Sequence, residues 1–89
     1  MLFTDGVKAM CDMFSCYWFL DIIVSYQPIL ADEFQVWKLE KEGNDSACVF
    51  CTNGNGKFLK QQKIQFADFK PKEATLWVEG SVILLPSEH

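Results

Sequence analysis

The clearest structural signal lies in residues 47–66, which read ACVFCTNGNGKFLKQQKIQF. The two Asn-Gly steps at 53–56 favour a tight turn, because Asn and Gly accept the positive φ angles that a β-hairpin needs. The segments on either side of this turn are rich in residues typical of strands. A phosphate-binding loop is excluded, because neither a Lys-Ser or Lys-Thr pair nor a helix follows the glycines. We therefore predict a β-hairpin over residues 47–66.

Further strands are predicted on both sides of this hairpin. Residues 33–41 precede it with β character, and a turn is expected at 43–45. Beyond a break in the pattern at 70–72, residues 75–78 and 81–85 read either as one strand bulged at Gly80 or as a short hairpin. Together these segments predict an antiparallel meander of four or five strands.

The N-terminal quarter of the chain predicts one long helix over residues 5–26. Thr4 and Asp5 supply N-cap chemistry, and Pro28 enforces a stop. Its apolar residues cover nearly the whole circumference, so the helix needs cover on two sides. The sheet covers one side, and a loop, a terminal segment or a second copy in a homodimer would cover the other. The predicted fold is α+β, a single domain over 1–89 with one long N-terminal helix packed on the meander sheet.

Composition narrows the function classes. The chain has 89 residues, of which 49% are hydrophobic and 15% aromatic, and this suits one folded domain. The chain has twelve acidic residues and eight basic residues, and all eight basic residues are Lys. The net charge of −4 and the lack of Arg disfavour direct nucleic-acid binding. The first fifty residues hold eight acids and three lysines. This excess predicts a basic protein partner, and the alternative is a solvated surface that only aids solubility.

The sequence also bears on location. No signal peptide is recognisable, because Asp5 and Lys8 stand where a basic n-region and an apolar core would begin. Reduced thiols and a cytoplasmic location in a bacterial host are therefore expected. The apolar run 13–30 is not read as a membrane span, because Asp21 at its centre would cost about 3 kcal/mol on insertion.

Residues for catalysis or metal binding are scarce. The single histidine is His89, the last residue, which removes His-based catalysis and metal ligation from any ordered site. Cys48 and Cys51 have the spacing of a zinc knuckle, but on a strand they point to opposite faces. Cys11 and Cys16 would lie about 140° apart on one continuous helix. All four are interpreted as core residues, and no metal and no cofactor is predicted.

Asp21 is the most unusual single residue. On a continuous helix it falls among Met10, Phe14 and Tyr17, inside the main apolar stripe. A carboxylate there must be hydrogen-bonded, paired or protonated. It is either a structural acceptor that fixes the helix on the sheet or a perturbed acid in a pocket. The second interpretation predicts a small-ligand binder or a minor enzyme with a pocket around Asp21.

Six stretches of the chain form a recognisable set of motifs: residues 4–7 (TDGV), 17–21 (YWFLD), 34–39 (FQVWKL), 54–56 (GNG), 66–69 (FADF) and 84–88 (LLPSE). These motifs resemble those of a small bacterial family, domain-of-unknown-function family 6876, which is met in bacterial, plasmid and phage sequences. The resemblance covers nearly the whole chain and implies no catalytic residue. It also implies a longer segment before Thr4 in other members, whose absence here would leave part of the helix uncovered.

The function predicted from these observations is a non-catalytic, acidic protein-interaction module. Its concrete version is a phage-encoded inhibitor of a bacterial defence complex, similar to an anti-CRISPR protein, whose acids oppose a basic nucleic-acid groove. Phe19 or Trp37 would provide the buried aromatic anchor. The acids expected to contact the partner are Asp32, Glu33, Glu40, Glu42 and Asp45.

Overall fold

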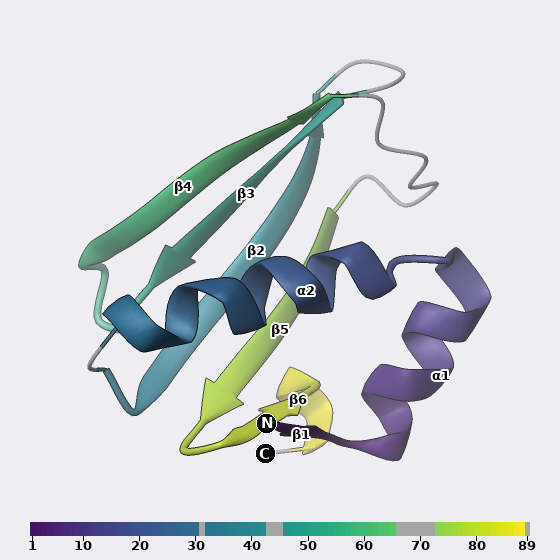
Figure 1. Ribbon diagram of the computed structural model, residues 1–89, viewed down its shortest axis with the longest axis horizontal. Helices are drawn as coiled ribbons and strands as arrows, with labels where there is room; N and C mark the ends of the chain where they lie inside the picture. The colour runs from purple at the N-terminus through teal and green to yellow at the C-terminus, as the bar shows by residue number, and fades with distance from the viewer. Residues whose placement is uncertain (31, 43–45, 66–72, 89) are drawn as a thin grey trace.

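The hairpin and its neighbouring strands form the centre of the molecule in the computed structural model. The structure describes residues 1–30, 32–42, 46–65 and 73–88, which contain two α-helices and a six-stranded sheet (Figure 1). The turn expected at 43–45, with Asp45, the break expected at 70–72 and His89 lie outside these residues. The strands are β1 (Leu2–Phe3), β2 (Phe34–Glu42), β3 (Ser46–Thr52), β4 (Phe58–Gln65), β5 (Glu73–Glu79) and β6 (Val82–Leu84).

The two hairpin turns that the structure describes contain glycines with positive φ. The predicted β3–β4 hairpin is confirmed, with Gly54 at φ 85° and Gly56 at φ 91°. Gly80, at φ 62°, joins β5 to β6, and the two strands pair antiparallel from Glu79 opposite Val82. The hairpin alternative for the C-terminal segment is therefore confirmed over the single bulged strand.

The strand order differs from the predicted meander, which is wrong in two respects. The order is β1-β6-β5-β2-β3-β4, so β5 returns past the first hairpin to pair with β2. This order places the apolar β5 inside the sheet, whereas β4, with Lys60 and Lys63, takes an edge, where lysines discourage pairing with other chains. In addition, β1 pairs with β6 in parallel, so the sheet is mixed and has six strands. A two-residue strand gives no recognisable sequence pattern.

The single long helix predicted over residues 5–26 is also wrong, because the segment forms α1 (Asp5–Phe14) and α2 (Tyr17–Tyr26). Ser15 adopts the left-handed conformation, with φ 53° and ψ 44°, and the Cys16 N–H donates to the Cys11 carbonyl at 3.2 Å. This is the Schellman ending of a helix. A straight helix over residues 5–26 would measure about 33 Å. It would therefore be as long as the longest axis of the molecule, which is 33 Å. The break lets both halves bury their apolar side chains against one core.

The two helices cover one face of the sheet. In Figure 1, α2 runs across β5 and β2, and α1 lies beside the edge formed by β1 and β6. Pro28 lies in the short 3-10 turn Gln27–Ile29 that ends α2, as expected. The buried core joins both helices to alternate residues of the strands. Its largest members are Trp37, Phe19, Ile23, Leu39, Leu76 and Ile83.

The opposite side of the sheet is called the open face here. It is formed by Phe34, Val36, Lys38, Glu40 and Glu42 of β2 and by the residues opposite them on β3 and β5. These side chains point away from the core because neighbours along a strand alternate between faces. Within the described parts of the chain, no helix lies over this face.

The start of α1 is tied to the end of the chain. The Thr4 hydroxyl accepts from the Val7 N–H at 3.2 Å, which confirms the predicted N-cap. The same hydroxyl donates to Glu88 Oε1 at 2.6 Å, and the Leu85 N–H donates to that oxygen at 2.9 Å. These hydrogen bonds favour the charged carboxylate and hold the pKa of Glu88 below its ordinary value.

Candidate functional site

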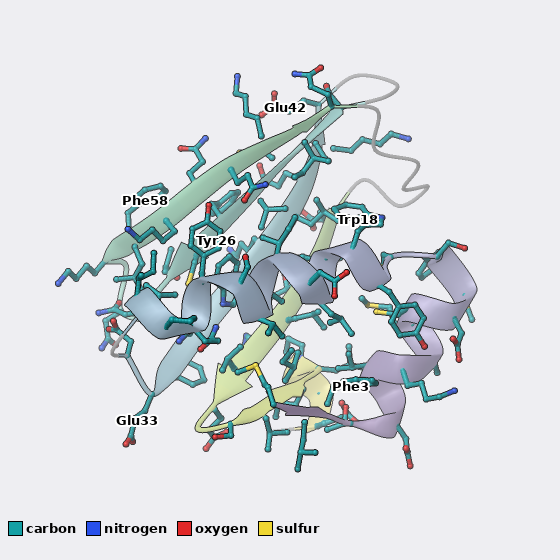
Figure 2. The ribbon with its side chains drawn as sticks, viewed as in Figure 1. Phe3, Trp18, Tyr26, Glu33, Glu42 and Phe58 are labelled. Atoms are coloured by element: carbon teal, nitrogen blue, oxygen red, sulfur yellow. The ribbon has the colours of Figure 1, made fainter. Side chains whose placement is uncertain are left out.

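The acids predicted to contact a partner do not form one cluster. Glu40 and Glu42 are exposed on the open face, near the end of β2. Asp32 and Glu33 precede β2, and Figure 2 shows Glu33 and Glu42 at opposite ends of the strand. Nine residues of extended chain separate them by about 30 Å. The candidate surface therefore keeps Glu40 and Glu42, whereas Asp32 and Glu33 belong to another end of the molecule.

The two aromatic residues predicted as anchors are core residues, and this prediction is wrong. Phe19 is 0% exposed and Trp37 is 1% exposed. Phe19 lies on the side of α2 that faces the sheet, and Trp37 lies on the helix side of β2. The Trp37 indole N–H donates to Gln35 Oε1 at 2.8 Å, so its polar atom is also satisfied internally. A partner cannot reach either ring while the domain is folded.

Asp21 is exposed, and its predicted place inside the apolar stripe is wrong. The prediction assumed one continuous helix, but the break at Ser15 changes the angular position of α2 relative to α1. Phe19, Leu20 and Ile23 instead form the buried side of α2. The groove between α2 and the β5–β6 turn is not lined by Asp21. Its lining residues are Met1, Val24, Gln27, Pro28, Gly80 and Ser81.

The open face carries a pair of like charges that the sequence pattern did not reveal. Glu40 on β2 lies directly opposite Glu73 on β5, and both side chains are exposed. Glu42 follows on the same face of β2, and Lys38 precedes on it. Like charges directly opposite each other across two strands are destabilising. Glu73 was missed because only the pairing of β2 with β5 brings it beside Glu40.

Aromatic side chains occupy the other end of the open face. Phe34 and Trp77 pack edge to face, with ring centroids 5.3 Å apart. The turn residue Gly54 lies against Phe34, since a Cβ atom there would come within 2.6 Å of the Phe34 ring. Phe58, at the start of β4 (labelled in Figure 2), is 55% exposed. The two-residue alternation along β2 and β5 is the signal that could have placed Phe34 and Trp77 on this face.

The cysteines occupy three different settings. Cys48 lies on the open-face side of β3 and Cys51 on the core side, as predicted from strand alternation. Cys11 and Cys16 are not far apart, as one continuous helix would require, because the break brings their sulfur atoms to 3.6 Å. Within the described ranges, no group of three or more His, Cys, Asp or Glu residues could hold a metal ion.

We expect the buried thiols to react slowly in the folded protein. Burial is the largest cause that raises the pKa of Cys11 and of Cys51 to about 12, and it also raises the pKa of Cys16. Since the thiolate is the reactive form, native labelling by an aromatic disulfide reagent at mildly alkaline pH should be far slower than labelling in denaturant. Rapid labelling of these three residues before unfolding would contradict this burial. Peptide mapping of the labelled sites identifies which cysteines react.

These features define a small α+β domain in which a broken helix covers one face of a mixed sheet and the second face is acidic at one end and aromatic at the other. No helix in the described residues has the length and apolar character to cross a membrane. The chain belongs to the family of unknown function DUF6876, whose model matches residues 1–89. This confirms the resemblance seen in the sequence motifs. Comparison with curated proteins and with solved structures found no match.

Proposed function

We propose that this chain is a non-catalytic protein-interaction module whose open face binds a basic surface of a protein partner. The observation that carries the proposal is the pair Glu40 and Glu73, which lie directly opposite each other on that face. Glu42 extends the acidic end, and the lysines of the described strands on this part of the face are Lys38 on β2 and Lys63 on β4, which lies opposite Cys48. A lysine- or arginine-bearing partner would relieve this repulsion on binding.

The aromatic end of the open face supports the same proposal. Stable interfaces combine a buried aromatic anchor with a polar rim. Phe34 and Trp77 are half-buried on this face and Phe58 is exposed near it, so these three residues replace Phe19 and Trp37 as the proposed anchor. The acidic end would then steer a basic partner, and the aromatic end would supply apolar contact area.

The finer version of the proposal names the partner as the basic nucleic-acid groove of a bacterial defence complex. Carboxylates spaced along a strand would occupy sites that phosphates otherwise fill, and the module would act as a competitive, anti-CRISPR-like inhibitor. Its support is the acidic balance of the chain, twelve acids against eight lysines, together with the complete lack of arginine. Such an inhibitor would work in the cytoplasm of a bacterial host.

Affinity capture from bacterial lysate, with matched charge variants as baits, tests the proposal. Tagged wild-type protein is compared with Glu40→Lys/Glu73→Lys and with Asp21→Lys/Glu33→Lys, which has the same net charge but changes exposed acids away from the open face. We expect one stoichiometric protein, held at moderate salt by the wild type and the control pair and lost from the open-face pair. Equal retention by both double variants, or a bait without any partner, would contradict the proposal. Far-ultraviolet circular dichroism confirms that each variant is folded, and light scattering detects a homodimer.

We expect Glu73→Gln to stabilise the domain. The substitution keeps the length of the side chain and removes one of two carboxylates that face each other across β2 and β5. The free energy of unfolding should rise by roughly 0.2–1 kcal/mol, and the gain should shrink with added salt because exposed charges are screened. Urea denaturation at two ionic strengths measures this change, with Asp21→Asn as the control. A loss of stability, or a gain that salt does not alter, would show that Glu40 and Glu73 do not repel each other.

A further inference from the structure

We propose that Asn55 is a site of spontaneous deamidation in the folded protein and that the neighbouring Asn53 is protected from the same reaction. The β3–β4 turn contains both residues, each followed by glycine. The local sequences are therefore nearly identical in their intrinsic reactivity. The difference in deamidation rate between Asn55 and Asn53 therefore comes from the fold. This inference does not rest on the proposed function.

The reaction consumes water and releases ammonia. The backbone nitrogen of the following residue attacks the side-chain amide carbon, a new C–N bond forms, and the bond to the side-chain nitrogen breaks as ammonia leaves. Water then opens the resulting succinimide ring at either carbonyl and gives aspartate or isoaspartate. Nothing is oxidised or reduced. The first step needs an amide group that can turn towards the next backbone nitrogen, and glycine at the next position removes the steric obstacle.

Hydrogen bonds hold Asn53 away from this geometry. Its Oδ1 accepts from the Asn55 N–H at 2.9 Å and from the Lys57 N–H at 3.1 Å, in the manner of an Asx turn. The attacking atom is engaged as well, because the Gly54 N–H donates to Thr52 Oγ1 at 3.4 Å. Gly54 also lies against the Phe34 ring, so the backbone at this step has little room to move. Ring closure at Asn53 would have to break these contacts.

At the next Asn-Gly step the backbone N–H of Asn55 is held by Asn53 Oδ1, but the groups that would react are not held. Asn55 and Gly56 are both exposed, and a Cβ atom at Gly56 would meet nothing within 4 Å. In the portions of the chain that the structure describes, no hydrogen bond holds the Asn55 side chain or the Gly56 N–H. The Asn55 amide can therefore rotate towards the Gly56 nitrogen without disturbing the hairpin.

The product changes the surface of the turn. Each conversion adds one negative charge two residues before Lys57, and the isoaspartate form also lengthens the backbone by one carbon atom. Gly54, one residue earlier, touches Phe34 on the open face. Deamidation therefore adds an acid at the border of the face that carries Glu40 and Glu73. The purified protein is expected to separate into charge variants as it ages.

Peptide mass spectrometry during incubation at mildly alkaline pH tests the assignment. We expect Asn55 to convert several-fold faster than Asn53 in the folded protein, and the two to convert at similar rates in denaturant, where the hydrogen bonds are lost. An Asn55→Ser variant should show no early acidic form, which separates this site from other amides. Faster or equal conversion of Asn53 in the folded chain would overturn the proposal. So would an intact Asn55 over a period in which the unfolded chain converts.

Discussion

The Phe19→Ala variant should lose roughly 3–5 kcal/mol of folding free energy. Phe19 is 0% exposed and lies in the core between α2 and the sheet, where it also contacts the Trp18 ring at a centroid distance of 6.3 Å. Removing the ring leaves a cavity that the packed strands cannot close. Domains are usually stable by only about 5–15 kcal/mol in total, so this loss would leave a marginal fold.

Urea denaturation followed by circular dichroism measures the change. The matched control is Phe58→Ala, the same substitution at a ring that is 55% exposed, for which we expect a change within about 0.5 kcal/mol. The two variants also separate core from interface. Phe58→Ala should stay folded and weaken partner binding, and unchanged binding by Phe58→Ala would remove Phe58 from the proposed anchor.

The break between the helices explains most of the errors in the sequence-based predictions. Apolar periodicity correctly indicated helix on both sides of Ser15, because either half has a buried stripe. It could not indicate the break, since the left-handed conformation that ends α1 is usually signalled by Gly or Asn, not by Ser. Every angle that was carried across Ser15 was therefore wrong. The prediction therefore placed the exposed Asp21 inside the apolar stripe and separated Cys11 from Cys16, whose sulfur atoms lie 3.6 Å apart.

The strands were predicted more accurately than their order. Residues 33–41, 47–52 and 57–66 were predicted as strands, and the observed β2, β3 and β4 agree to within one residue at each described end. The Asn-Gly turn has a local conformational cause, so it was visible in the sequence. The pairing of β5 with β2 depends on contacts distant along the chain, and no local pattern encodes it.

The candidate site could likewise be predicted where local sequence determines it and not where strand pairing determines it. Glu40 and Glu42 could be proposed from charge alone, and the structure places both on the open face of β2. Glu73 entered the site only through the register that sets it against Glu40, whereas alternation along β5 could have indicated the face on which Trp77 lies. Phe19 and Trp37 were predicted as anchors because the sequence alone does not distinguish a large aromatic residue of the core from one of an interface. Burial in the fold is what distinguishes the two.

The second large loss is expected for Gln35→Leu. Gln35 is 1% exposed and is the one buried polar side chain among the described residues. Its Nε2 donates to Gln27 Oε1 at 3.0 Å and to the Asp32 carbonyl at 2.9 Å. Its Oε1 accepts from Gln27 Nε2 at 2.9 Å and from Trp37 Nε1 at 2.8 Å. This one amide therefore joins the end of α2 to β2 and satisfies the indole at the centre of the core.

Leucine fills similar space but supplies no hydrogen bond, so the Trp37 N–H and the Asp32 carbonyl lose their partner. Each buried group left unsatisfied costs about 1–3 kcal/mol, and we expect a total loss of about 2–5 kcal/mol in urea denaturation. The control is Gln62→Leu, which removes a single hydrogen bond, from the Tyr26 hydroxyl at 3.0 Å, at a half-buried site. In a double-mutant cycle with Trp37→Phe, which carries its own cavity cost, Gln35→Leu should cost less in the Trp37→Phe background than in the wild type, because the orphaned donor is already absent. Wild-type stability in Gln35→Leu would mean that the amide does not stabilise the connection between α2 and β2, and an equal cost of Gln35→Leu in both backgrounds would mean that its hydrogen bond to Trp37 contributes nothing.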